Sequence, residues 1–151
     1  MPQTIHAEST AIIDAKPEVV YNLLSDYVNG HPRILPKEYF ADLIVEQGGK
    51  GAGTVLQVTT KAFGAKIKLR MRVTEAIPGK LLVEEDIDKT FATSFIFEPH
   101  DSGNKTELRI ATDWQKKPGL KGFIEGLTTP PVARMIYKKE LKLIAEHISG
   151  K

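Results

Sequence analysis

Apolar and polar residues alternate with a period of two from about residue 39 to residue 114, and this alternation predicts a series of β-strands. The expected strands are 39–47, 53–61, 65–77, 81–87, 90–98 and 105–114. Short turns rich in glycine, proline, aspartate or asparagine separate them, among them Phe63-Gly64 and Pro78-Gly79. Because a parallel crossover needs a dozen or more residues, strands joined by such turns must be antiparallel neighbours.

The chain before residue 39 predicts one more strand and two short helices. Residues 4–13 mix β-branched and small side chains, which favours a strand. Pro17 and Glu18 suit the first turn of a helix, and apolar residues then recur at helical spacing until Asn29-Gly30. Residues 33–35 are expected to form a second brief helical turn before Pro36.

The C-terminal segment, residues 117–149, predicts a helix with a break at Pro130-Pro131 and an uninterrupted stretch after it. At 100° per residue, one wide apolar arc forms along residues 132–148, and Glu140 falls inside it. The arc contains Ala133, Ile136, Tyr137, Leu141, Leu143, Ile144 and Ile148. This helix is expected to cover the apolar face of the sheet.

Two strand pairs carry more detailed expectations. In the hairpin around residues 101–104, Phe91, Phe95 and Phe97 should share a face with Leu108, Ile110 and Trp114. A hairpin centred on Pro78-Gly79 places Arg72 opposite Asp86 and Arg70 opposite Asp88. The basic row of residues 66–72 is therefore interpreted as a solvated outer face, and a nucleic-acid groove is the less favoured alternative.

Composition sets the class of protein. The 151 residues suit one domain, residues 1–151, and a hydrophobic content of 41% with a net charge of +2 excludes intrinsic disorder. No apolar run reaches the length of a membrane span, and the N-terminus does not resemble a signal peptide, so a cytoplasmic protein is expected. The absence of cysteine excludes thiolate metal sites and cysteine nucleophiles.

The chain resembles the START-like (SRPBCC) superfamily, and in particular its polyketide cyclase/dehydratase and lipid-transport family. The opening motif spans Ile12 to Tyr21 and continues through Leu24-Ser25-Asp26-Tyr27 to residues 31–36. Further similar segments are residues 51–54, 73–81 and 97–108. The resemblance implies an α+β helix-grip fold, in which a curved antiparallel sheet of about seven strands surrounds a long C-terminal helix.

The resemblance also implies a cavity between sheet and helix that takes a hydrophobic or amphipathic small molecule. Its expected walls are Leu69, Met71, Val73, Phe95, Leu108, Trp114, Phe123, Leu127, Ile136 and Tyr137, with Tyr27, Leu35 and Phe40 near an entrance. Each of these residues could equally belong to an ordinary hydrophobic core.

Inward carboxyl groups would add chemistry to such a cavity. Glu140 is a candidate from its helical phase, and Glu75 and Glu85 are candidates because they share a strand face with Val73 and Val83. Buried without a cation they could act as general acids, and the Tyr137 hydroxyl could orient a ligand carbonyl. The alternative for the carboxyl groups is an ordinary salt bridge. The four histidines are scattered, so no metal site is expected, and His31 is the one placed near the cavity mouth.

The sequence is compatible with two main functions and with a third, less favoured one. Binding or transport of a lipid, quinone or polyketide-like molecule is favoured over a cyclase or dehydratase enzyme, because no acid–base pair is assured. A third hypothesis makes the amphipathic segment 117–130 a docking site for a partner. No cofactor is expected, and the protein is expected to be a monomer or a weak homodimer.

Overall fold

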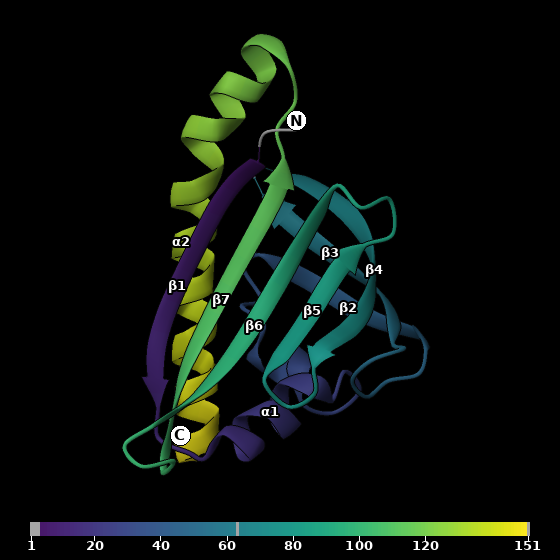
Figure 1. Ribbon diagram of the computed structural model, residues 1–151. Coiled ribbons are helices and arrows are strands. Elements are labelled where there is room, and N and C mark those ends of the chain that lie inside the picture. The colour runs from purple at the N-terminus through teal and green to yellow at the C-terminus, as the bar shows by residue number, and fades with distance from the viewer. Residues whose placement is uncertain (1–3, 63, 151) are drawn as a thin grey trace.

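The computed structural model describes residues 4–62 and 64–150, and it shows one sheet, one long helix and two short helical elements (Figure 1). The turn expected at Phe63-Gly64 therefore lies partly outside the described residues. The elements in chain order are β1 (Thr4–Ile13), α1 (Pro17–Ser25), the 3₁₀ helix η1 (His31–Ile34), β2 (Phe40–Gln47), β3 (Val55–Ala62), β4 (Ala65–Ile77), β5 (Leu81–Asp86), β6 (Phe91–His100), β7 (Lys105–Gln115) and α2 (Gly119–Ser149).

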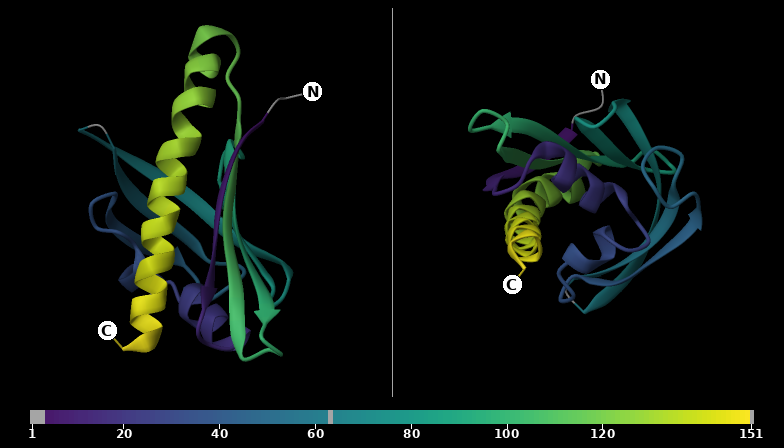
Figure 2. Two further views of the ribbon diagram at one scale, coloured as in Figure 1. Left: turned by 90° about the vertical axis from the view of Figure 1, so that its left-hand side faces the viewer. Right: turned by 90° about the horizontal axis from the view of Figure 1, so that it is seen from below.

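The seven strands form one antiparallel sheet in the order β1-β7-β6-β5-β4-β3-β2. Each pair from β2 to β7 is a hairpin, as the short turns predict, and β1 closes the sheet by pairing with the last strand. Figure 2 shows the sheet curving around α2, with α1 and η1 at one end. The predicted α+β architecture is confirmed, although the second short helix is only the single 3₁₀ turn of η1.

The β6–β7 hairpin has the register that the sequence predicts. Phe91 lies opposite Trp114, Phe95 opposite Ile110, and Phe97 opposite Leu108. Phe95, Phe97, Leu108 and Ile110 are almost fully buried beneath the C-terminal half of α2 and α1. The alternation of apolar and polar residues in these strands was therefore sufficient to assign the inner face.

The β4–β5 pair differs from the predicted register by one residue. Ile77 lies opposite Leu81, as expected, but a bulge between Thr74 and Ile77 shifts the pairing beyond it. Arg72 consequently lies opposite Glu85 instead of Asp86, and Arg70 forms its ion pair with Glu46 of β2 at 2.6 Å. The bulge places one extra residue in β4, and a one-residue shift exchanges the two faces of the partner strand.

Helix α2 runs without interruption from Gly119 to Ser149, so the break expected at Pro130-Pro131 is wrong. The two prolines deprive the carbonyls of Gly126 and Leu127 of their helical N–H donors. Leu127 is exposed and Gly126 is partly exposed, so water can hydrate these carbonyls at modest cost. Proline fixes φ near the helical value, and the backbone can therefore stay helical through both residues.

No helix within the described residues is both long enough and apolar enough to cross a membrane. Burial in α2 is concentrated after the prolines, where Ala133, Tyr137, Leu141 and Ile144 face the sheet as the helical phase predicts. The hydrophobic core therefore lies between the C-terminal half of α2 and the concave face of the sheet. It does not fill all of the space between them.

Candidate functional site

A cavity of about 570 Å³ lies between α2 and the concave face of the sheet. Its walls are largely apolar, and the apolar side chains that line it are Leu35, Phe40, Leu43, Leu56, Val58, Ile67, Leu69, Met71, Phe91, Phe95, Trp114, Val132, Ala133 and Ile136. They come from η1 and its flank, β2, β3, β4, β6, β7 and α2. The sheet is too strongly curved for the helix to fill it completely, and the space that remains is this cavity.

Some residues that line the cavity are also exposed to solvent, and these mark its rim. They include Ile67 on β4, Thr90 before β6, Lys117 just before α2, and Thr128 on α2. The cavity therefore reaches the surface beside the first turns of α2. The ionisable side chains deeper in the cavity come from η1, β5 and α2.

A cluster of buried polar side chains forms one end of the cavity. His31 of η1, Glu84 of β5 and Glu140 of α2 each have at most 7% of their surface exposed. The Nε2 atom of His31 lies 3.6 Å from Oε2 of Glu84 and 3.9 Å from Oε1 of Glu140. Behind them, the Tyr27 hydroxyl donates a hydrogen bond of 2.8 Å to the same Glu84 oxygen. Two carboxyl groups and one imidazole thus meet inside an otherwise apolar cavity.

Glu140 is the least satisfied member of this cluster. Its Oε1 atom is buried and has no hydrogen-bond partner among the described residues. Burial raises the pKa of Glu140 well above its usual range, and the negative charge of Glu84 raises it further. Glu140 is therefore suited to remain a neutral carboxylic acid, which can donate a hydrogen bond into the cavity.

The tautomer of His31 follows from its backbone contact. Its Nδ1 atom lies 2.8 Å from the carbonyl oxygen of Leu24. Because a carbonyl oxygen only accepts, Nδ1 must carry a proton, and in the neutral ring Nε2 is then the acceptor. The ring is held between Tyr27, which stacks on it, and Phe95, which meets it edge to face. His31 therefore presents a fixed basic nitrogen to the two carboxyl groups.

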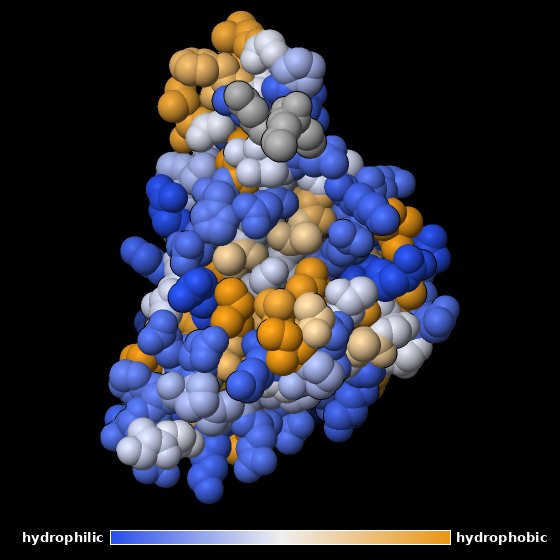
Figure 3. Space-filling view, in the orientation of Figure 1, coloured by the Kyte–Doolittle hydropathy of each residue, from blue (hydrophilic) through white to orange (hydrophobic). Residues whose placement is uncertain are grey.

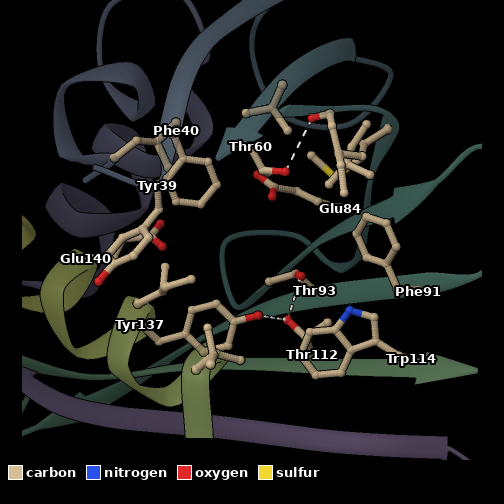
Figure 4. A pocket seen from close by; sticks show the side chains of 18 of the residues that line it. Tyr39, Phe40, Thr60, Glu84, Phe91, Thr93, Thr112, Trp114, Tyr137 and Glu140 are labelled. Atoms are coloured by element: carbon tan, nitrogen blue, oxygen red, sulfur yellow. Dashed lines mark hydrogen bonds between the residues drawn. The ribbon is translucent and has the colours of Figure 1, made fainter. Parts of the chain in front are cut away.

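A second polar chain crosses the sheet beside Trp114. The Tyr137 hydroxyl is hydrogen-bonded to the Thr112 hydroxyl, which lies 2.6 Å from the Thr93 hydroxyl. Figure 4 shows the Tyr137 hydroxyl directed at Thr112, next to the indole of Trp114. Burial raises the pKa of Tyr137 to about 12, so it remains a neutral phenol at physiological pH.

The charged side chains of the cluster do not form a metal site. Within residues 4–62 and 64–150, no group of three or more histidine, aspartate or glutamate side chains is arranged to hold a metal ion. What the geometry offers is hydrogen bonding and proton transfer, with Glu140 as a donor and His31 Nε2 as an acceptor.

Comparison with known families assigns the chain. A family model described as polyketide cyclase/dehydrase and lipid transport matches residues 4–149, almost the whole sequence. The chain belongs to this family. Among curated proteins, none matches it significantly.

Solved structures share the fold of this polyketide cyclase/dehydrase and lipid transport family member. The solution structure of KanY protein is 26% identical, with a TM-score of 0.82 over 97% of this chain and 99% of that one. The di-domain ARO/CYC StfQ from the steffimycin biosynthetic pathway is 18% identical, with a TM-score of 0.76 over 98% of this chain and 53% of that one. Ara h 8.0201 is 13% identical, with a TM-score of 0.66 over 99% and 100%. The fold is the helix-grip fold of START-like proteins.

Several residues that the sequence analysis predicts at the cavity border it in the structure. Those that border it are Leu35, Phe40, Leu69, Met71, Phe95, Trp114, Ile136, Tyr137 and Glu140. Three other residues expected at the cavity, Val73 and Leu108 in its walls and Tyr27 near an entrance, are buried in the core but are not part of the lining. Tyr27 was expected near an entrance, yet it is only 1% exposed and acts behind Glu84.

Four further expectations are contradicted by the structure. Phe123 and Leu127 are 58% and 63% exposed and lie outside the lining, because α2 continues past the end of the cavity. Glu85 does not border the cavity, because the β4–β5 bulge turns Glu84 inward instead. Glu75 lies at that bulge, and its Oε1 atom is buried near Gly51 and Tyr21 rather than in the cavity.

Glu84 is the member of the buried polar cluster that the sequence analysis missed. Leu81, Leu82 and Val83 are all apolar, so alternation in β5 fits either face equally well. The register beyond the bulge in β4 is what places Glu84, instead of Glu85, on the inner face. His31 was singled out, but it was placed at the mouth, whereas it is 2% exposed at the inner polar end.

Proposed function

We propose that the protein binds an uncharged, largely hydrophobic small molecule in the cavity, with a carbonyl or hydroxyl group of that molecule against Glu140. Lipids, quinones and polyketide-like compounds fit this description. The observation that carries the proposal is the buried Oε1 atom of Glu140, which has no hydrogen-bond partner within residues 4–62 and 64–150 and borders an apolar cavity. A buried polar atom without a hydrogen bond is costly, and a ligand oxygen would remove that cost.

The size and lining of the cavity support this proposal. About 570 Å³ lies within the range of roughly 300–1,000 Å³ that small-molecule sites occupy. Apolar walls with a few convergent polar groups are the usual composition of such sites. The family description, which includes lipid transport, is consistent with a molecule of this class.

Native mass spectrometry of the purified protein tests the proposal first, because a retained ligand adds its own mass. Fluorescence then measures affinity: Trp114 is the single tryptophan and borders the cavity, so an apolar ligand should change its emission. The Glu140→Gln variant should weaken binding of carbonyl-containing ligands, since an amide is a weaker donor than a carboxylic acid. Glu146→Gln on the same helix, outside the lining, is the matched control.

Failure would be clear in this design. If neither retained mass nor a fluorescence response occurs across a broad panel of lipids and quinones, the binding proposal is wrong. If ligands bind but Glu140→Gln and Glu146→Gln behave alike, Glu140 does not contact the ligand.

A cyclase or dehydratase activity is the second candidate, and the position of His31 favours it. Its Nε2 atom lies between two carboxyl groups at the inner end of the cavity. In a dehydration, Nε2 would accept a proton from the carbon next to a carbonyl. Glu140 would donate its proton to the hydroxyl on the neighbouring carbon, which leaves as water. The Tyr137 hydroxyl could orient the carbonyl.

The activity test uses a β-hydroxy ketone as substrate and follows the conjugated product by its absorbance. His31→Asn should abolish conversion and retain binding, because asparagine can still donate to the Leu24 carbonyl. No conversion by the native protein, with binding intact, would leave binding as the function.

A further inference from the structure

The beginning of α2 carries a concentration of exposed apolar side chains. Leu120, Phe123, Ile124 and Leu127 are 74%, 58%, 49% and 63% exposed. Their spacing of i, i+3, i+4 and i+7 places them on one face of the helix. Figure 1 shows this end of α2 rising past the sheet, and Figure 3 shows hydrophobic residues gathered over it. We call residues 116–127 the α2 tip.

The charge of the α2 tip is positive. It contains three lysines and one glutamate. Lys117 lies 3.6 Å from Glu125, whereas Lys116 and Lys121 form no ion pair among the described residues. An exposed apolar face flanked by lysines is typical of helices that enter the interface of a membrane with anionic lipids.

The α2 tip also adjoins the rim of the cavity. Lys117 and Thr128, which bracket the apolar face in the sequence, both border the cavity and are exposed. Ile67, on β4, is a further rim residue and is 54% exposed. The α2 tip is therefore a neighbour of the opening through which a hydrophobic molecule would enter or leave.

We propose that the α2 tip docks onto the surface of an anionic lipid bilayer, with Leu120, Phe123, Ile124 and Leu127 among the headgroups and acyl chains. Lys116 and Lys121 then lie at the level of the phosphate groups. Because the α2 tip adjoins the rim of the cavity, docking would hold the opening close to the bilayer, which shortens the path of a hydrophobic ligand between membrane and cavity. Docking itself does not require that the ligand be known or that the cavity be filled.

Vesicle flotation of the full chain tests the docking. The protein should float with vesicles of phosphatidylcholine mixed with phosphatidylglycerol, and much less with phosphatidylcholine alone or at high salt. The double variant Phe123→Glu/Leu127→Glu should lose roughly tenfold or more of its vesicle affinity, because two apolar side chains that would enter the bilayer are replaced by negative charges. Lys121→Ala should lose severalfold on the anionic vesicles only.

Ile44→Ser is the matched control, because Ile44 is 53% exposed on β2, which does not belong to the α2 tip. It should float like the native protein. Circular dichroism confirms that each variant is folded. Glu140→Gln should also float normally, so a failure of ligand binding can be told apart from a failure of docking.

Three results would overturn the proposal. The first is the absence of flotation with either vesicle type. The second is equal flotation of the double variant and the native protein. The third is a dimer, measured by analytical ultracentrifugation, that the double variant abolishes while vesicles fail to bind, since that would assign the α2 tip to a second copy of the chain.

Discussion

The two halves of α2, before and after the prolines, both carry large apolar residues but have opposite surroundings. After Pro131, Ala133, Tyr137, Leu141 and Ile144 are buried against the sheet and α1. Before Pro130, only Gly122 is buried among the residues of the helix. A 31-residue helix is about 46 Å long, whereas the ten residues of β1 beside it span about 33 Å.

This difference in length explains the difference in burial. Some 13 Å of helix, or about nine residues, must extend past the strand that it packs on. Apolar side chains of α2 therefore supply the core in one half and an exposed surface in the other. Hydrophobicity in a helix shows that a surface is apolar, and only the dimensions of the neighbouring sheet show whether that surface is covered.

The sharpest test of this contrast is a pair of truncations. Ile144→Ala in the packed half should lower the free energy of unfolding by about 3 kcal/mol, because Ile144 is fully buried and the change leaves a cavity. Leu127→Ala in the projecting half should change it by no more than about 0.5 kcal/mol. Urea denaturation followed by circular dichroism measures both, and equal losses would contradict the contrast.

A pH series examines the buried carboxyl group in the packed half. Folded Glu140 keeps its proton to higher pH than the unfolded chain does, because burial raises its pKa above 4.5. The contribution of Glu140 to stability should therefore be greatest below about pH 4.5 and fall as the pH rises toward the folded pKa. Over that window Glu140→Gln should gain stability relative to the native protein, by at most about 1.4 kcal/mol per pH unit.

The control for this series is Glu146→Gln, which should follow the native protein at every pH. Glu84, His31 and Tyr137 also face Glu140, so the comparison is made between variants that retain all three. Parallel curves for Glu140→Gln and the native protein would show that Glu140 ionises normally.

A smaller effect is expected at the polar contact between the packed half and the sheet. Tyr137→Phe should lower the free energy of unfolding by about 1 kcal/mol, since it removes one buried hydrogen bond to Thr112. Thr112 keeps its contact with Thr93, which limits the loss. Thermal unfolding measures this change, and a loss near that of Ile144→Ala would indicate a wider network than the one described.

The smallest effect is expected where the two halves join. Pro130→Ala should raise the free energy of unfolding by roughly 0.5–1 kcal/mol, because an N–H group becomes available to the Gly126 carbonyl. The more flexible unfolded chain offsets part of the gain. A decrease in stability would show that Pro130 is needed for the geometry of the helix, and the same urea denaturation would detect it.

Most of the fold could be predicted from the sequence because its signals are local and repeated. The period of two in β6 and β7 assigns the inner face and the register without ambiguity. The helical phase likewise places Glu140 among buried residues of α2, where the structure has it. Short turns leave antiparallel pairing as the only way to connect the strands.

The candidate site was predicted less completely, because its details depend on single residues and on lengths. The bulge after Thr74 has no distinct sequence signal, and β5 is apolar on both faces up to Val83. Phe123 and Leu127 satisfy the pattern of a buried helix, yet nothing in that pattern states where the sheet ends. His31 reaches the inner end of the cavity because η1 packs against α2, which brings its Nε2 atom within 3.6 Å of Glu84 on β5.

The bulge has a consequence for how β5 tolerates insertions and deletions. A one-residue slip along this strand would exchange Leu82 for Val83 and Glu84 for Glu85 on the inner face. Each exchange replaces a side chain by one of the same kind, so an aliphatic residue followed by a carboxyl group would still face inward. Glu84-Glu85 is thus a redundant pair, because loss of the bulge would move the inner carboxyl group without removing it. A one-residue error in strand pairing would therefore leave a carboxyl group in the cavity.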